Sequence, residues 1–141
     1  MAAVNMLDER LDPVRLPIAS IVDVLAVRRQ GLDMALALGF SQADGTQIAA
    51  AISELARNIV FQAAGKGMIT LIAQAGNPKG IKIVAQDSGP GIADVEAVLA
   101  GRSSPPELRK EVLTLRQIMD EFELRSIVGV GTTIRTAKWV Q

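Results

Sequence analysis

The chain has 141 residues and contains no cysteine and no histidine. Without these residues it cannot form a disulfide, a thiolate nucleophile, a Ser-His-Asp triad or any of the usual zinc sites. Any catalysis therefore has to use carboxylates, lysine, serine or threonine hydroxyls, backbone groups, or a hard cation such as Mg²⁺.

Net charge is absent and aromatic side chains are few. Fifteen basic residues balance fifteen acidic residues, and aromatic residues make up only 3% of the chain. Proteins that bind nucleic acids usually present a basic surface, and many of them also stack bases on aromatic side chains. We therefore expect no nucleic-acid partner.

Long hydrophobic runs are missing as well. The apolar stretches are too short to span a bilayer, and the N-terminal residues MAAVNMLDER lack the pattern of a signal peptide. This predicts a cytoplasmic protein that has no membrane partner. With 49% apolar and 21% charged residues the composition is globular, and the length predicts one domain over residues 1–141. Within it, the polar residues 1–12 are expected to form a loose start.

Hydrophobic periodicity, together with glycine and proline breaks, divides the chain into helices and strands. Strands are expected over residues 15–22, 68–74, 81–86, 124–128 and 132–140. Helices are expected over residues 24–38, 46–63, 92–100 and 107–122, and Asp23 is expected to cap the first of them. Because short turns join neighbouring strands, we predict a two-layer α/β sandwich with helices on one face of a mainly antiparallel sheet.

The helix expected over residues 46–63 carries a polar pair at the border of its apolar face. Glu54 and Asn58 are four residues apart and share one side of the helix, next to the stripe formed by Ile48, Ile52, Leu55 and Ile59. An asparagine oxygen suits Mg²⁺, and a glutamate can accept a proton from a hydroxyl group or from water. Taken alone, the pair fits an ordinary solvated helix flank better.

A second motif is the sequence DSGPG (87–91), which directly follows the apolar strand at residues 81–86. Alternation along this strand places Asp87 on the same face as its apolar residues, where a carboxylate needs a hydrogen-bond donor. The exocyclic amine of an adenine could be that donor, and Gly89 and Gly91 would let the backbone approach a flat ligand closely. An Asx turn, in which the carboxylate bonds its own backbone, explains the motif equally well.

A third motif is GVGTT (129–133), at the turn between the last two expected strands. It reads either as a plain turn followed by threonines that favour strands, or as a pair of hydroxyl groups, Thr132 and Thr133, beside the same ligand. Each of the three motifs is weak evidence by itself. All three in this order and at this spacing are much less expected by chance than any one of them alone.

In combination the motifs resemble the Bergerat ATP-binding fold of the histidine-kinase, gyrase, Hsp90 and MutL superfamily. Within it, the chain is most similar to the small anti-sigma-factor protein-serine kinases of the RsbT-like family, and the resemblance runs over nearly the whole chain. The stretches that carry it are AISELARNI (51–59), AGKG (64–67), IKIVAQDSGPGIAD (81–94), MDEF (119–122) and GVGTTIRTAKW (129–139).

The resemblance implies ATP and Mg²⁺ as cofactors and assigns roles to individual residues. Glu54 would be the general base that activates the target hydroxyl, and Asn58 would hold Mg²⁺. Asp87 would accept a hydrogen bond from the adenine amine, supported by Thr132 or Thr133. Gly89, Gly91 and Ile92 would complete the nucleotide pocket.

The resemblance also implies partners. The substrate would be a serine on a small STAS-domain antagonist in a stressosome, and a PP2C-type phosphatase or a sigma factor would be a second partner. A homodimer is a further possibility within this family.

One departure from the family pattern leaves two functions open. The family has a glycine-rich ATP lid before its last helix, whereas here no glycine occurs between Gly101 and Gly129, and the segment contains two prolines and an expected helix. The chain is then either an ATP-dependent protein-serine kinase with a degenerate lid, or a pseudokinase that docks its partners without catalysis. Retention of Glu54 and Asn58 favours the kinase.

Overall fold

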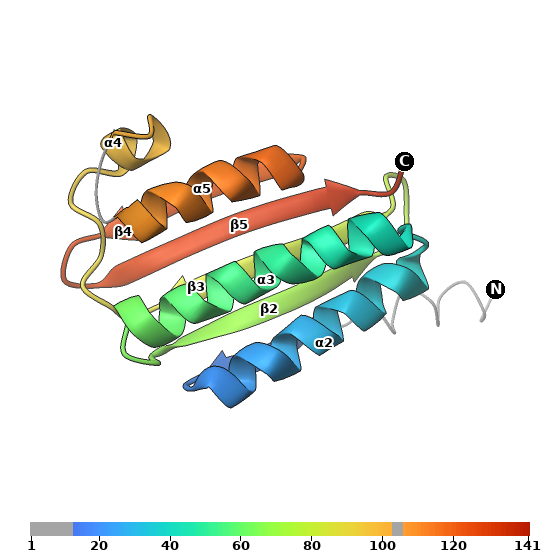
Figure 1. Ribbon diagram of the computed structural model, residues 1–141, viewed down its shortest axis with the longest axis horizontal. Coiled ribbons are helices and arrows are strands. Elements are labelled where there is room, and N and C mark those ends of the chain that lie inside the picture. Colours follow the sequence, from blue (N-terminus) through green and yellow to red (C-terminus); the bar gives the residue numbers. More distant parts are fainter. Residues whose placement is uncertain (1–12, 103–105) are drawn as a thin grey trace.

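The computed structural model describes residues 13–102 and 106–141 (Figure 1). The expected loose start at residues 1–12 lies outside the described residues. Along the chain the elements are β1 (Val14–Ile18), α2 (Ile21–Leu38), α3 (Gln42–Gln62), β2 (Gly67–Gln74), β3 (Gly80–Asp87), α4 (Val95–Leu99), α5 (Pro106–Ile118), β4 (Glu121–Ile127) and β5 (Gly131–Trp139).

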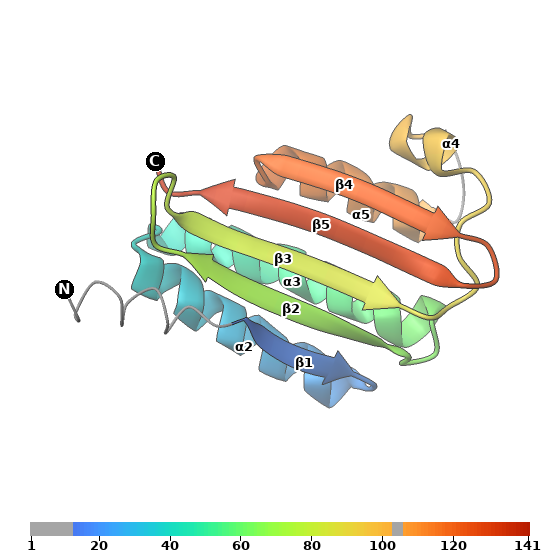
Figure 2. The ribbon, with the colours of Figure 1, turned by 180° about the vertical axis from the view of Figure 1, so that it is seen from behind.

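The strands form one antiparallel sheet in the order β1-β2-β3-β5-β4. Helices α2, α3 and α5 all lie on the same face of it, which Figures 1 and 2 show from opposite sides. This confirms the predicted two-layer α/β sandwich and its antiparallel sheet. Among the described residues, no helix is both long and apolar enough to cross a membrane.

Helix α3 is the central helix of the layer, because it contacts α2 on one side, α5 on the other and the sheet beneath. Its expected apolar stripe is confirmed: none of the four side chains is more than 2% exposed, namely those of Ile48, Ile52, Leu55 and Ile59. Alternate residues of β2 and β3 meet this stripe and are fully buried, namely Ile69, Leu71, Ile81 and Ile83. The buried stripe fixes how α3 is rotated on the sheet.

The first helix begins earlier than expected. The strand predicted over residues 15–22 ends at Ile18, and α2 starts at Ile21 with Ser20 as its N-cap. Asp23 acts in the first turn rather than as the cap, because its Oδ2 accepts hydrogen bonds from the backbone N–H of Ala19 (2.8 Å) and of Ser20 (3.2 Å). These two bonds satisfy free donors at the helix start and outweigh the strand preference of the β-branched residues that follow.

Helix α3 also begins earlier, at Gln42 rather than near residue 46. Ser41 is the N-cap, and its Oγ accepts from the backbone N–H of Asp44 at 3.0 Å. Because of Gly45, the sequence SQADG was expected to form a loop. Gly45 instead lies inside α3, where α2 packs closely against it. A Cβ at this position would lie 3.1 Å from a methyl group of Leu36.

Helix α5 ends at Ile118, whereas its periodicity predicted an end at residue 122. The backbone N–H of Asp120 donates to the carbonyl of Ala137 at 2.8 Å, so the chain is already hydrogen-bonded to β5 there. Phe122 therefore belongs to β4 rather than to the helix. Pairing with β5 overrides the helical pattern at this boundary.

A pair of substitutions on α3 tests the packing. Ile52→Ala removes a fully buried side chain, and we expect it to lower the free energy of unfolding by about 2–5 kcal/mol. Phe61→Ala on the same helix removes a side chain that is 66% exposed, and we expect a change within roughly 0.5 kcal/mol. Urea denaturation would measure both, and equal losses would contradict this view of the core.

Candidate functional site

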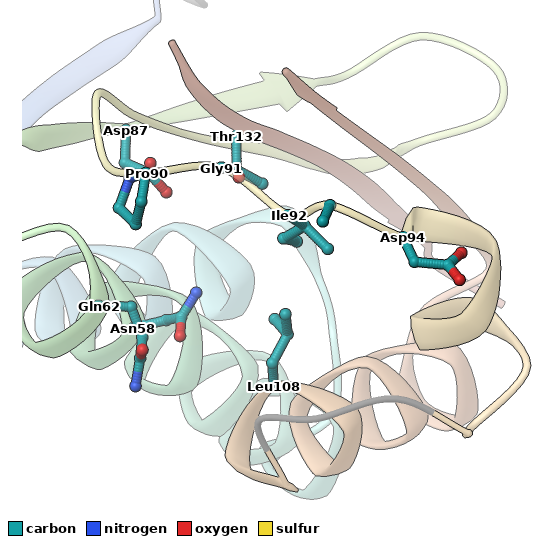
Figure 3. Close-up of a pocket in the computed structure, with 10 residues that line it drawn as sticks. Asn58, Gln62, Asp87, Pro90, Gly91, Ile92, Asp94, Leu108 and Thr132 are labelled. Atoms are coloured by element: carbon teal, nitrogen blue, oxygen red, sulfur yellow. The ribbon is translucent and has the colours of Figure 1, made fainter. Parts of the chain in front are cut away.

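Helix α3 presents a line of polar side chains along the border of its buried stripe. Glu54, Asn58 and Gln62 follow each other at intervals of four residues, so they lie on one side of the helix. Asn58 and Gln62 both line the cavity that lies between α3 and the segment that follows β3 (Figure 3). Gln62 was missed by the sequence analysis, although the same spacing of four residues extends the pair to include it.

The chain turns sharply after β3, at Asp87. The Oδ1 atom of Asp87 accepts from the backbone N–H of Gly89 at 2.9 Å, which is the Asx turn considered from the sequence. Its Oδ2 atom makes no hydrogen bond to any part of the chain that the structure describes, and Asp87 lines a cavity. The turn and a ligand contact are therefore compatible, since each uses a different oxygen.

The two glycines of this turn are needed for contacts within the protein. Gly91 has a φ of 81°, and a Cβ there would lie 2.5 Å from the carbonyl oxygen of Ile127. A Cβ at Gly89 would lie 2.9 Å from the Cβ of Ala63. Both glycines were predicted to let a ligand approach closely, but the nearest groups are Ala63, the residue after α3, and Ile127 of β4. Of the two, only Gly91 lines the cavity.

A serine on β4 holds the turn against the sheet. The Oγ atom of Ser126 accepts from the backbone N–H of Ile92 at 2.7 Å and lies 2.8 Å from Oγ1 of Thr132. Thr132 pairs with Asp87 across the strands and lines the cavity. Thr133 is not among the lining residues, because alternation along β5 turns it to the other face. No local motif of the sequence pointed to Ser126.

These elements enclose a cavity of about 220 Å³, called here the inner cavity. Its walls are Asn58 and Gln62 of α3, Asp87 and residues 90–94 of the turn, Leu108 of α5 and Thr132 of β5. The expected residues Asn58, Asp87, Gly91, Ile92 and Thr132 are thus brought together (Figure 3). Glu54 and Gly89 lie outside this wall.

A second hollow of about 350 Å³, called here the outer cavity, lies next to the first. It is lined by Glu54, Arg57, Asn58, Phe61, Gln62 and Glu111. Asn58 and Gln62 belong to both cavities, so they stand at the junction between them. Glu54 is 41% exposed here, and its carboxylate is paired with the guanidinium of Arg57.

Glu111 of α5 is the principal residue that the sequence analysis missed. It is only 4% exposed, and its Oε1 atom has no hydrogen-bond partner among the residues that the structure describes. Burial raises the pKa of its carboxyl group well above the usual value, and the negative charges of Glu54 and Asp87 raise it further, against the opposing effect of Arg57. A signal was present: Glu111 lies three residues after Leu108 and four before Leu115, inside the apolar stripe of the helix.

The region expected to replace the glycine-rich lid is largely helical. The described part contains α4, whose start is capped by Asp94 through a bond of 2.9 Å to the backbone N–H of Ala97, and then α5. Side chains of α5 enter the core, and Leu108 reaches the inner cavity (Figure 3). One wall of the cavity is therefore a packed helix rather than a loop.

The raised pKa of Glu111 predicts a dependence of stability on pH. The folded protein keeps a proton on Glu111 that the unfolded chain releases above its usual pKa of 4.5. The free energy of unfolding should therefore fall as the pH rises above this value, until the folded-state pKa is passed. Glu111→Gln removes this contribution, so its stability relative to the unchanged protein should increase between pH 5 and pH 8. Urea denaturation at both values checks this, and a constant difference would contradict it.

The family of this chain is shown by a curated relative rather than by a family model. No model of a known protein family matches it. Among curated proteins, it is 43% identical over 122 residues to the serine/threonine-protein kinase RsbT of Bacillus subtilis (strain 168), and the match covers 84% of this chain and 90% of that protein.

Solved structures give the same fold. The chain is similar to the blue-light activated histidine kinase of Erythrobacter litoralis EL346, with a TM-score of 0.53 and 16% identity over 83% of this chain and 46% of that one. A histidine kinase domain from the same protein gives a TM-score of 0.52 and 14% identity over 86% of this chain and 60% of that one. At these identities the likeness shows the fold alone. The 43% identity over most of both sequences carries further: the chain belongs to the RsbT-like family of serine/threonine-protein kinases.

Proposed function

We propose that this chain is an ATP-dependent kinase that phosphorylates a serine or threonine of a STAS-domain antagonist, in a stressosome or sigma-factor partner-switching pathway. The observation that carries the proposal is the position of Asn58, which lines both the inner and the outer cavity. A transferase needs its nucleotide site and its acceptor site to meet at one point, and the amide of Asn58 is at that point.

The inner cavity suits the base of a nucleotide. Its 220 Å³ is below the roughly 300–1,000 Å³ of pockets that enclose a whole drug-sized ligand. Asp87 offers an oxygen that has no hydrogen-bond partner within residues 13–102 and 106–141. Ile92 offers apolar surface, and Thr132 is held by Ser126. A carboxylate acceptor in this position would select an adenine, which has an exocyclic amine.

The junction suits the phosphates and their cation. When bound, Mg²⁺-ATP supplies the phosphoryl group, and the cation offsets the charge of the phosphates. Asn58 would hold the Mg²⁺ through its amide oxygen, a ligand type that hard cations accept. Gln62, one helical turn away, is a second amide facing the same space.

The outer cavity suits the acceptor hydroxyl. Glu54 is accessible there, and Arg57 holds its carboxylate in place on the surface of α3. A carboxylate in this position would accept the proton of an incoming serine or threonine hydroxyl group as that oxygen attacks. Positioning by the fold and this proton transfer are the contributions of the chain itself.

Exposed apolar side chains at this end of the molecule support a protein substrate. The first turns of α2 present Ile21, Val22 and Leu25, and the turn between β4 and β5 presents Val128 and Val130, all between 46% and 73% exposed. Both segments lie at the end where β3 leads into the cavity wall, as the two ribbon views show. Exposed apolar groups of this kind are typical of protein-docking surfaces, and the same end would receive the antagonist, a PP2C-type phosphatase or a sigma factor.

Glu54→Gln tests the proposed base. General-base catalysis contributes about 10²–10⁴-fold, so phosphate transfer to a purified STAS-domain protein should fall by at least about 100-fold. Binding of a non-hydrolysable ATP analogue, measured by calorimetry, should stay unchanged because Glu54 is outside the inner cavity. Asp33→Asn, which removes an exposed carboxylate on α2, is the control. Equal transfer by Glu54→Gln would remove this residue from the mechanism, and no transfer by the unchanged protein would leave a docking module.

Asp87→Asn tests the adenine contact. The asparagine oxygen can still accept from Gly89, so the turn is preserved, but the charged acceptor for the adenine amine is lost. A hydrogen bond to a charged group is worth about 1.5–3 kcal/mol, so the affinity for the ATP analogue should fall by roughly 10–100-fold. Calorimetric titration measures this change. An unchanged affinity would restrict Asp87 to its role in the turn.

A further inference from the structure

Phe61 of α3 is the aromatic side chain that the described part of the chain leaves most open to water. It is 66% exposed, whereas Phe40 is buried and Phe122 and Trp139 are partly buried. A single exposed apolar residue is common on protein surfaces and needs no explanation by itself. Phe61 differs because it lines the outer cavity together with Glu54, the proposed base. Its ring therefore forms part of the hollow in which the acceptor hydroxyl group would bind.

The geometry of the helix places Phe61 in line with Glu54. Phe61 follows Glu54 by seven residues, which is close to two full turns, so both side chains lie on the same side of α3. At 1.5 Å of rise per residue, Phe61 lies about 10 Å further along the helix axis. An extended chain advances roughly 3.3 Å per residue, so this separation matches about three residues of a segment that runs along α3.

Other exposed apolar residues continue this surface on the neighbouring helix. The end of α3 lies beside the start of α2 (Figure 1), where Ile21, Val22 and Leu25 are exposed. Aromatic residues that are surrounded by other contacts are typical anchors of protein interfaces. A protein partner that covers the start of α2 would therefore reach Phe61 and the outer cavity with the same surface.

We propose that Phe61 is an anchor for the protein substrate, and that it binds an apolar side chain about three residues from the acceptor serine or threonine. The inference rests on the proposed function, because Glu54 defines where the hydroxyl group would lie. It deepens that function by naming a feature that the substrate must have. Phe61 does not contact the reacting atoms, so its role is to determine substrate specificity.

Calorimetric titration of the full chain with a purified STAS-domain protein tests the anchor. Nucleotide is omitted, so binding is measured without phosphate transfer. Phe61→Ala should weaken binding about tenfold or more, because burial of a phenylalanine side chain contributes at least that factor. Phe61→Leu keeps an apolar group and should restore most of the affinity. The affinity for the ATP analogue should be the same in these variants, since Phe61 is outside the inner cavity.

Leu36→Ala is the control for the loss of an exposed apolar side chain. Leu36 is exposed near the end of α2 and does not line the outer cavity, so its replacement should leave binding unchanged. Circular dichroism of each variant shows whether it is folded. Because the ring of Phe61 is exposed, weaker binding by Phe61→Ala would not result from unfolding.

Kinetics of phosphate transfer test the spacing. Alanine is substituted, in the STAS-domain protein, for an apolar residue three positions before or after the phosphorylated residue. At one of these positions the substitution should raise KM and leave kcat unchanged. The same substitution should have no further effect with Phe61→Ala, because the two side chains would form a single contact. Additive effects would contradict the proposed spacing.

Two outcomes of the titration would overturn the anchor: equal binding of the STAS-domain protein by Phe61→Ala and the unchanged protein, or no binding by the unchanged protein. A loss confined to a PP2C-type phosphatase, titrated in the same way, would assign the surface to that partner and overturn the proposal as well. Equal binding would leave the proposed kinase intact, because Glu54→Gln and the ATP analogue test it separately. Conversely, weaker binding by Phe61→Ala would support the anchor even if no phosphate transfer were detected.

Discussion

Burial of one apolar stripe of α3 against the sheet is the constraint on which the site depends. Ile48, Ile52, Leu55 and Ile59 fix the rotation of the helix, because any other rotation would expose them to water. With that rotation set, the adjacent line of Glu54, Asn58 and Gln62 has to face the end of β3 and the start of α5. The core thus positions the polar groups without contacting a ligand itself.

Two further interactions bring the other walls of the site to this helix. Ser126 binds the backbone of Ile92 and the hydroxyl of Thr132, which ties the turn after β3 to the last two strands. Gly91 allows that turn to pass close to Ile127. The result is an inner cavity that shares Asn58 and Gln62 with the outer cavity, which Glu54 lines. In the proposed function, the nucleotide base would occupy the inner cavity and the acceptor hydroxyl group the outer cavity.

Helix α5 gives the site a character that differs from a flexible lid. It is packed through Leu108, Val112 and Leu115, so it contributes to the core as well as to the wall of the site. It also brings the carboxyl group of Glu111 into a buried position near Glu54 and Asp87. The raised pKa of this carboxyl group links the stability of the protein to pH.

The sequence by itself determined the architecture and pointed to five of the ten residues that line the inner cavity: Asn58, Asp87, Gly91, Ile92 and Thr132. Periodicity and turn residues are local properties, so the antiparallel two-layer sandwich and the stripe of α3 could be predicted from them. The grouping of Asn58, Asp87 and Thr132 followed from the resemblance to the RsbT-like family. Tertiary structure decided the rest, because long-range contacts are not visible locally. The pairing of Asp120 with β5 ended α5 early, the packing of α2 placed Gly45 inside a helix, and strands distant in the sequence brought Ser126 to the turn. The charges that surround Glu111 come from two other elements, α3 and β3, and only the folded chain brings them together.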